Sequence, residues 1–496
     1  MRFGPPVSLL FIALVVAGCS GPSATTSSTA PAVSAASLNP PAQGLVFHKD
    51  GGVIVSASHY PGEPPVFAER YVGTRGAGEP TIGVNARGTA IFPSIAFDVA
   101  GGQLASTRVF ISKDEGNTWN DRSPSIANLA LVPAQPTSLD PYVYADPVTG
   151  RLYTMDLYLG CSNASWTDDD GATWVTNPVV CGIPVDDHQT LSAGPARTLP
   201  VVPAPVGTGR MLYYCVNQIG ASTCTHSVDG GLTWTAGIPP YPGVEQQPDG
   251  NPVNAVCGGL HGHIHVSEVS GTLFVPKIQC GRPEVARSTD GGLTFTRSVI
   301  DFVSGGTGHD GAVATDAAGH VYYFWLDSKG FPRLAVSQDD GVTWGASLNV
   351  TAPGVTAAKF PAITAGADGR IAFYYVGSTV KGGFDANATV MANATWSGYA
   401  GFSLNATQED PVFATVTIHP AADPLKRGDC GGRCGGMFDF FDIQVNPKTG
   451  QVWASAVDLC NDACALAAGT SKDPVTSRGA VGVQVGGTLL GSPLPA

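Results

Sequence analysis

The chain has 496 residues, a net charge of −13 and only 13% charged residues, and it holds 63 glycines and 39 prolines. No basic stripe runs through it, so nucleic acid is excluded as an expected partner. Abundant glycine and proline beside frequent Val, Ile, Tyr and Phe predict many short strands joined by tight turns. The length exceeds that of most single domains, which favours a repeat fold.

The first 43 residues predict export and attachment to a membrane. Arg2 precedes an apolar run, 7–17, which is too short to span a bilayer and has the length of a signal-peptide core. The run ends in "VAGC", which resembles the bacterial lipobox and implies cleavage before Cys19 and lipidation of Cys19. We therefore expect a lipoprotein signal peptide at 1–18 and a flexible Ser/Thr/Ala/Pro-rich tether at 19–43. The expected location is the cell surface or the periplasm; an ordinary secretory signal is the alternative.

The other ten cysteines fall mostly in pairs that are close in sequence. An even number of cysteines in an exported chain predicts disulfides. The pairs are Cys161 with Cys181, Cys215 with Cys224 and Cys257 with Cys280, followed by a late group of Cys430, Cys434, Cys460 and Cys464. The spacing within "CGGRC" and "CNDAC" also permits zinc, but export favours two disulfides in the late group.

Seven segments have the pattern of a hairpin, with alternating apolar residues on both sides of a turn such as "NPKTG" or "GADG". In chain order they span residues 80–92, 141–155, 188–216, 263–276, 311–325, 360–376 and 441–457. Their regular recurrence predicts structural repeats that each begin with a pair of strands.

Each of the first five hairpins is followed by the phrase S/T-x-D-x-G-x-T-W/F, in copies that begin 49 to 61 residues apart. The phrase resembles the Asp-box, or BNR repeat, of sialidases and other β-propellers. That resemblance implies a turn between the third and fourth strands of a blade. We expect the Asp to accept backbone hydrogen bonds, the Gly to supply a positive φ and the Trp to pack between blades. The turn aspartates are Asp114, Asp169, Asp229, Asp290 and Asp339.

The next residue in the fifth copy, Asp340, would make an apparent pair of carboxylates with Asp339. The matching position is Glu, Asp or Gly in the other copies. We therefore expect Asp340 to be a solvated neighbour of a structural turn.

Together the repeats predict an all-β fold in which residues 44–496 form a β-propeller. The seven hairpins indicate seven four-stranded blades; six remain an alternative because the sialidases that share the phrase have six. Blade six lacks the phrase, and "TWSGYAGFSLNA" and "PVFATVTI" are its expected outer strands. No fourth strand follows "RGAVGVQVGG", so "GLVFHKDGG" or "PVFAERYV" near the N-terminus is expected to close the ring and remove an exposed edge.

Ionisable residues stand just before almost every expected inner strand, at the face where propellers usually bind a ligand on the axis. Four of the ten histidines are among them. The set is Glu79, Asp140, Tyr142, Asp187, His188, His261, His263, His309, Asp310, Lys359, Asp439 and Asp442. We expect this ring to bind a glycan or protein ligand; polar residues that cap turns would produce the same pattern.

Two chemistries could use the ring. His261, His263 and His309 could bind a divalent metal, because imidazole suits Zn, Mn and Fe; no other cofactor is expected. Alternatively, Asp140 and Asp310 could serve as acid and base in glycoside cleavage, with Tyr142 and Glu79 in the role of the sialidase nucleophile pair.

Sialidases also need three arginines around the substrate carboxylate, because bidentate, permanently cationic partners hold that group. No arginine of this chain stands at the start of an expected inner strand, and Arg87, Arg151, Arg210 and Arg370 lie in the first hairpin turns, at the opposite face. The sequence therefore predicts a monomeric, membrane-anchored propeller that binds a ligand in its central channel. A sialidase-type glycoside hydrolase and a metal-dependent lyase or hydrolase are the alternatives.

Overall fold

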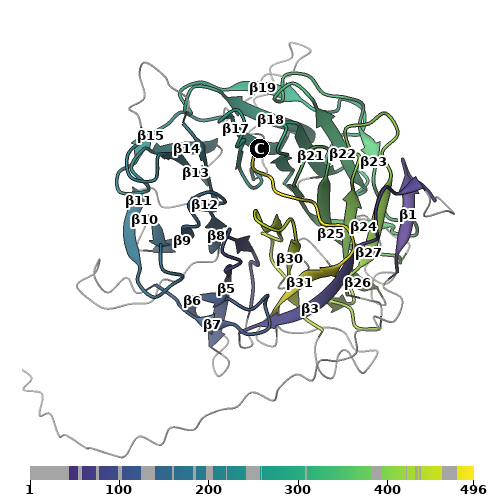
Figure 1. Ribbon diagram of the computed structural model, residues 1–496, viewed down its shortest axis with the longest axis horizontal. Helices are drawn as coiled ribbons and strands as arrows, with labels where there is room; N and C mark the ends of the chain where they lie inside the picture. The colour runs from purple at the N-terminus through teal and green to yellow at the C-terminus, as the bar shows by residue number, and fades with distance from the viewer. Residues whose placement is uncertain are drawn as a thin grey trace, which may run out of the picture. The chain divides into compact units, whose positions relative to one another are not determined.

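The computed structural model of the protein describes residues 44–53, 59–73, 77–98, 103–124, 140–158, 161–181, 186–196, 205–218, 221–241, 257, 260–307, 310–380, 394–419, 422–430, 434, 437–460 and 477–495. All named elements in these ranges are β-strands, which form seven sheets around a central axis (Figure 1). No helix within these ranges has the length and apolar character needed to cross a membrane. The prediction of an all-β propeller is confirmed.

Five four-stranded sheets follow one another along the chain, each built from four successive antiparallel strands. Their strands are β4 (Gly83–Val84), β5 (Ala90–Asp98), β6 (Gln103–Ser112) and β7 (Asn120–Asp121); β8 (Tyr142–Ala145), β9 (Leu152–Tyr158), β10 (Cys161–Thr167) and β11 (Val175–Cys181); β12 (Asp186–Pro195), β13 (Arg210–Gln218), β14 (Ala221–Ser227) and β15 (Thr235–Ala236); β16 (His265–Val266), β17 (Leu273–Gln279), β18 (Arg282–Ser288) and β19 (Thr296–Val299); β20 (Ala312–Thr315), β21 (Val321–Leu326), β22 (Pro332–Ser337) and β23 (Leu348–Asn349).

The sixth sheet along the chain is larger and has seven strands. Its main path begins with the successive strands β24 (Ala357–Ala365), β25 (Ile371–Ser378), β26 (Thr395–Ser403) and β27 (Phe413–Thr417). Two N-terminal strands, β1 (Val46–Lys49) and β2 (Gly52–Val53), extend this path beyond β27, and β28 (Lys426–Arg427) pairs with β26. Among the described residues, six sheets are therefore four-stranded and one is enlarged, whereas the hairpins indicated seven four-stranded blades, with six as the alternative.

The last sheet closes the ring with a strand from the other end of the chain. Strands β29 (Ile443–Val445), β30 (Val452–Asp458) and β31 (Arg478–Gly486) are followed by β3 (Val66–Val72), which pairs with β31. Strand β3 is the segment "PVFAERYV", so the predicted closure by an N-terminal strand is confirmed. The other candidate, "GLVFHKDGG", contains β1 and lies on the enlarged sheet instead.

The apolar core lies between neighbouring sheets. Phe274 of the fourth sheet and Tyr323 and Trp325 of the fifth belong to one buried cluster. Phe92 of the first sheet and Trp453 of the last belong to another, which joins the two ends of the ring. Burying a large side chain of this kind contributes roughly 2 to 3 kcal/mol, so these interfaces hold adjacent sheets together.

The five repeated turns share one hydrogen-bond pattern. In the fifth, the backbone N–H of Thr343 donates to Oδ1 of Asp339 (2.8 Å) and the Thr343 hydroxyl donates to Oδ2 (2.6 Å). These bonds lower the pKa of Asp339 to about 2. Gly341 has φ +78° and donates its N–H to Oγ of Ser337. The equivalent Thr-to-Asp bonds recur at Asp114, Asp169, Asp229 and Asp290.

The expectation that Asp340 is a solvated neighbour is wrong. Its carboxylate accepts hydrogen bonds from Ser270 Oγ (2.6 Å) and Thr272 Oγ1 (2.7 Å) and pairs with Arg287 (3.0 Å). All three partners belong to the preceding sheet, so Asp340 joins two blades. A comparison of turn copies along the sequence cannot find these donors because they come from a different repeat.

Among the described residues, three disulfides join cysteines that are close in sequence: Cys215–Cys224, Cys257–Cys280 and Cys430–Cys434. The first two are pairs predicted from the sequence, and the third lies within the late group, where two disulfides were expected. Disulfides form and persist in oxidising compartments, so they indicate an exported protein. Cys19, the expected lipidation site, and the tether lie outside the described residues.

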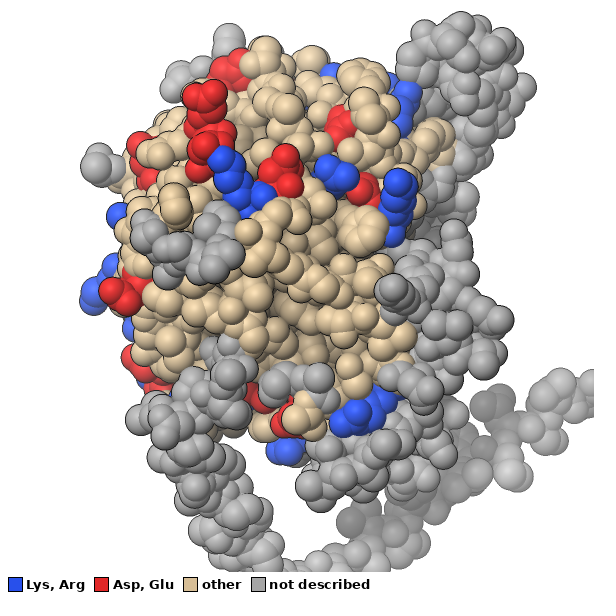
Figure 2. Space-filling model, turned by 90° about the vertical axis from the view of Figure 1, so that its right-hand side faces the viewer, with Lys and Arg blue, Asp and Glu red and all other residues tan. Residues whose placement is uncertain are grey.

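Figure 2 shows one side of the propeller, which carries charged side chains of both signs toward its two edges and a broad, mostly uncharged surface between them. The mostly uncharged surface of this side agrees with the composition of the chain, in which only 13% of residues are charged. The charged groups that matter for the site below are instead largely buried on the axis.

Candidate functional site

Residues that precede all seven inner strands meet at one end of the axis. Contacts connect Glu79, Asp140 and Asp439, His188 and Asp310, and His188 and His261. Phe360, near the start of the sixth inner strand, lines a pocket together with His263 and Asp439. The structure thus brings together most of the ring predicted from the sequence; His309 lies outside the described residues.

The backbone is distorted at four of these positions. Glu79, His188, Phe360 and Phe440 have left-handed φ values of 52°, 55°, 56° and 57°. Such conformations cost a non-glycine residue about 1 kcal/mol or more and cluster at functional sites. At His188 and at Phe360 the pairing register of the inner strand also shifts, which is a bulge that re-aims side chains.

Three buried carboxyl groups form the base of the site. Oxygens of Glu79, Asp140 and Asp439 lie within 4.8 Å of one another, and the N–H of Asp439 donates to Oε2 of Glu79 (2.8 Å). Burial, followed by the nearby Asp439 and Asp140, raises the pKa of Glu79 well above its usual value. Burial and the adjacent Asp187 raise the pKa of Asp140 to about 8. Burial therefore favours the protonated forms of Glu79 and Asp140.

His188 forms the first histidine–carboxylate pair of the site. Its Nε2 lies 2.8 Å from Oδ2 of Asp310; the histidine side chain is 2% exposed and the aspartate side chain 20%. Burial lowers the pKa of His188, but Asp310, Asp439 and Asp140 raise it more, to about 9. The imidazole is therefore a buried cation at neutral pH, and its partner Asp310 reaches the surface.

His263 forms the second pair. Its Nδ1 lies 3.7 Å from Oδ1 of Asp442, and the imidazole is 18% exposed. Asp442 is fixed because it accepts the N–H of Ile443 (2.8 Å). The ring of Phe440 stacks on His188 (centroids 4.2 Å apart) and on His263 (5.6 Å), so one aromatic side chain contacts both imidazoles.

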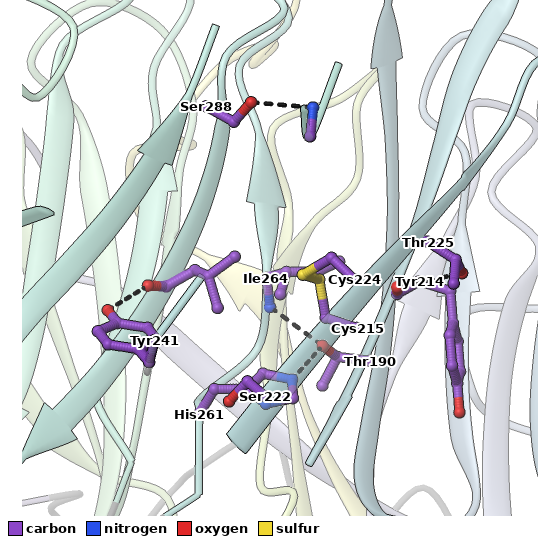
Figure 3. The surroundings of a disulfide bond; sticks show 12 residues. Thr190, Tyr214, Cys215, Ser222, Cys224, Thr225, Tyr241, His261, Ile264 and Ser288 are labelled. Carbon is purple, nitrogen blue, oxygen red and sulfur yellow. Dashed lines mark hydrogen bonds between the residues drawn. A yellow bond between two sulfur atoms is a disulfide. The ribbon is translucent and has the colours of Figure 1, made fainter. Parts of the chain in front are cut away.

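His261 is the neutral histidine of the group. Burial, and then the positive neighbours His188 and Lys277, lower the pKa of His261 well below its usual value. Figure 3 shows its Nε2 facing Thr190 Oγ1 (3.2 Å), which also accepts the N–H of Ile264, beside the Cys215–Cys224 disulfide. His261 therefore supports the walls of the site.

The remaining ring residues lie at its edge. Tyr142 is buried against His263 (centroids 5.2 Å apart). Lys359 is 5% exposed, and burial lowers the pKa of its ammonium group to about 8, against the effect of Asp429. Asp187 is half-buried next to Asp140.

Two cavities open from this cluster. The outer pocket, about 20 Å³, is lined by His263, Asp310, Asp439, Phe360 and Phe440 among others. The second cavity, about 100 Å³, lies within the channel and is lined by residues of all seven inner strands. In the described part of the chain, no arginine lines either cavity.

The arginine arrangement of a sialidase is therefore not found among the described residues. Arg210 pairs with Asp146 (2.6 Å) and Glu268, and Arg151 pairs with Asp168 (2.7 Å). Asp146 and Glu268 lie in turns between the first two strands of their blades, and Asp168 lies in a repeated turn between the third and fourth strands. Arg210 and Arg151 are therefore held away from the axial site, at the opposite face, as the sequence predicted.

Among the described residues, a group of carboxylate oxygens could also hold a divalent metal. Glu79, Asp140 and Asp439 are close enough to share an ion, and hard cations such as Ca²⁺ prefer carboxylate oxygen. Three side-chain oxygens are fewer than the six to eight ligands of Ca²⁺, so water or a bound ligand would have to complete the shell. The trio of His261, His263 and His309 stays a prediction.

Sequence reasoning missed the aromatic part of the site. Phe360 lies at the bulge of β24, as His188 does in β12, and Phe440 precedes β29. Only ionisable residues were considered at these positions of the sequence, although "DFFD" places Phe440 between two aspartates of the segment. Gln189 and Asn217 were also missed; they donate to the carbonyl of Asp140 and accept the N–H of His261, respectively.

Fold and site together define an exported β-propeller with an acidic, histidine-containing cluster on its axis. No protein-family model matches the chain, and no curated protein sequence does. Similar solved structures include a protein of unknown function from Dyadobacter fermentans (15% identity, 86% of this chain, 100% of that chain, TM-score 0.42). The NanB sialidase from Streptococcus pneumoniae shares 12% identity (87% and 70% coverage, TM-score 0.39), and the GH74 xyloglucanase from Xanthomonas campestris 13% (79% and 54%, TM-score 0.44).

Proposed function

We propose that this exported propeller is a lipid-anchored protein of the cell surface or periplasm that binds a neutral glycan at the axial site. The lipobox-like "VAGC" supports the anchor at Cys19, and the Ser/Thr/Ala/Pro-rich segment 19–43 would hold the propeller away from the membrane.

One observation carries the choice of ligand class. His263 and Asp310, each held by a partner of complementary chemistry, line one pocket together with the ring of Phe440. Imidazole and carboxylate groups can donate to and accept from sugar hydroxyls, while an aromatic face packs against the apolar face of a sugar ring. A few fixed polar groups beside aromatic side chains are typical of small-ligand sites.

The charge of the site favours a neutral ligand over an acidic one. Asp310 and Asp439 line the pocket, Asp442 lines the adjoining cavity, and Asp140 and Glu79 lie close to Asp439. A ligand carboxylate or sulfate would face like charges without an arginine among the described lining residues to pair with it. We therefore expect sialylated and sulfated glycans to bind more weakly than neutral ones.

Hydrolysis of the bound glycan is the second candidate function, and one observation favours it. The pKa of Asp140 is raised to about 8, so this carboxyl is protonated at neutral pH, while Asp310 is paired with cationic His188. Two carboxyl groups in opposite protonation states are the arrangement from which glycosidases obtain an acid and a base or nucleophile.

A glycan array tests the proposal. The full chain, purified in detergent, is applied to neutral, sialylated and sulfated glycans beside the variants His263→Gln, His263→Ala and Asp339→Ala. We expect neutral glycans to bind, both His263 variants to lose at least about tenfold in affinity, and Asp339→Ala, in a turn at the other end of the blade, to bind as the wild type does. The factor of ten corresponds to the loss of about one charge-assisted hydrogen bond.

Two results would contradict the proposal: binding confined to acidic glycans, or unchanged binding by folded His263 variants. Incubating the bound glycans and assaying new reducing ends separates a hydrolase from a binder. Repeating that assay with EDTA, then with added Ca²⁺ or Zn²⁺, tests the metal-dependent alternative.

A further inference from the structure

The cavity inside the channel adjoins the outer pocket. The two share the lining residues His263 and Ala312, which therefore stand at the boundary between them. The inner cavity measures about 100 Å³ and is lined by residues of the inner strands. An engineered cavity of about 150 Å³ holds a benzene ring, so this one admits part of a sugar ring rather than a chain of sugars.

The cavity wall consists mainly of neutral polar and small apolar side chains. His265 is one of the polar ones: its Nε2 faces Thr315 Oγ1 (2.8 Å) and accepts the N–H of Thr315 (3.2 Å). Burial lowers the pKa of His265 to about 4, so the ring is neutral and carries its proton on Nδ1. The two carboxylates of the wall are both paired, Glu268 with Arg210 and Asp442 with His263. This lining suits the hydroxyl groups of a ligand and disfavours a ligand group that carries an unpaired charge.

The C-terminal segment borders the far end of the cavity. After β31 the chain runs across the first hairpin turns toward the axis, as the yellow trace in Figure 1 shows. The N–H of Leu490 donates to Gly450 O (3.0 Å), and the N–H of Ala367 donates to Leu490 O (2.9 Å). A Cβ on Gly450 would lie 2.1 Å from the nitrogen of Gly491, so glycine is required for this approach. Pro493 then lines the cavity.

The cavity thus adjoins the outer pocket at Ala312 and is bordered by Pro493 at its other end. We propose that it is a blind subsite that receives the terminal group of a linear neutral ligand, whose next units occupy the outer pocket at His263 and Asp310. The inference rests on the proposed function, because it assigns a second part of the same glycan to this cavity. With this subsite, the protein recognises the ends of glycan chains rather than their internal segments.

Ligands with blocked ends test the subsite. The probes are cello-, manno-, malto- and laminaritetraose, each free, capped with a benzyl ether at the non-reducing end, or coupled to a fluorophore at the reducing end. For any probe that binds the wild-type full chain, we expect one of the two modifications to weaken binding at least tenfold and the other to change it less than threefold.

The variant Ala312→Phe adds bulk at the boundary between the pocket and the cavity without altering a polar group of the outer pocket. We expect it to weaken binding of the free tetrasaccharide at least tenfold and to remove the difference between free and capped forms. Val342→Phe adds the same bulk at an exposed turn and should match the wild type. Thermal unfolding of each variant identifies misfolding, and the comparison of end-blocked ligands on the wild type does not depend on any variant.

The outcomes separate the two proposals. If both end-blocked forms bind as tightly as the free sugar while His263→Ala loses binding, the blind subsite is wrong and the glycan site stands. If no tetrasaccharide binds the wild type and the array shows no neutral glycan, both proposals fail together.

Discussion

At the turn end of the blades, Asp339 accepts hydrogen bonds from Thr343 and Ser337 and remains largely exposed. At the other end, Asp140 is buried beside Asp187 and Asp439. The pKa of Asp339 is about 2 and that of Asp140 about 8, although both residues are aspartates in the same propeller. The surroundings rather than the residue type decide which carboxyl supports a turn and which can take part in chemistry.

The largest effect is expected for Asp310→Ala. This substitution leaves the buried His188 without its ion-pair partner, so the free energy of unfolding at pH 7 should fall by about 3 kcal/mol. The pKa of His188, which NMR titration can follow, should also fall. Asp168→Ala is the matched control, because Asp168 pairs with Arg151 but its side chain is 64% exposed; it should cost less than about 1 kcal/mol. If the two variants lose equal amounts of unfolding free energy, the ion pair at the axial end is no more important for stability than the one at the turn end.

The pH dependence of stability should have opposite signs at the two ends. The folded-state pKa of Asp140 is raised to about 8. Its contribution to the free energy of unfolding is therefore fully present below about pH 4 and is lost as the pH rises through 8. His188, with a pKa of about 9, likewise loses its contribution as the pH rises from about 6.5 through 9. For Asp339, with a pKa of about 2, the contribution is present above about pH 4 and is lost as the pH falls.

Denaturant unfolding between pH 4 and 9 checks this prediction. The wild type should lose stability as the pH rises, and Asp140→Asn should flatten that decrease. Asp339→Asn should leave it unchanged. If the free energy of unfolding of the wild type instead increases up to pH 8, the axial carboxyls are not protonated in the folded state.

A smaller effect is expected for Asp340→Ala, which removes the contacts between two blades. Losing its bonds to Ser270, Thr272 and Arg287 should lower the free energy of unfolding by about 2 kcal/mol. Glu115→Ala changes the matching position of the first turn, which is exposed, and should cost no more than about 0.5 kcal/mol. If urea unfolding gives the same cost for both, Asp340 behaves as the solvated side chain expected from the sequence.

The smallest effect is expected for Asp339→Ala. The loss of the turn bonds should cost about 1 kcal/mol, as for a helix N-cap, and should leave glycan affinity within twofold of the wild type. Thermal unfolding and the glycan array measure the two quantities. A large loss of affinity would place the ligand at the turn end instead.

The turns could be predicted from the sequence because each is local. The partners of Asp339 lie within four residues of it, so one repeat contains the whole hydrogen-bond pattern. The hairpins are equally local, and all seven pairs of inner strands were located. Strand β3 could be proposed only as one of two closing strands, because its partner β31 lies at the other end of the chain.

The axial site could be predicted only as a set of positions. Glu79 and Asp439 are 360 residues apart in sequence, and they meet because the ring closes. Counting the residue before each inner strand therefore identified Asp140, His188 and Asp310. It could not show that Asp310 pairs with His188, or that the left-handed backbone of Phe440 accompanies a ring that stacks on two histidines.

A crystal structure of the full chain soaked with the best-binding neutral glycan of the array tests the central claim most directly. We predict density for the sugar on the axis, within hydrogen-bond distance of His263 and Asp310 and stacked against Phe440. Density at the turn end, between blades or on the outer wall, with the axial pocket free of sugar, would contradict the account.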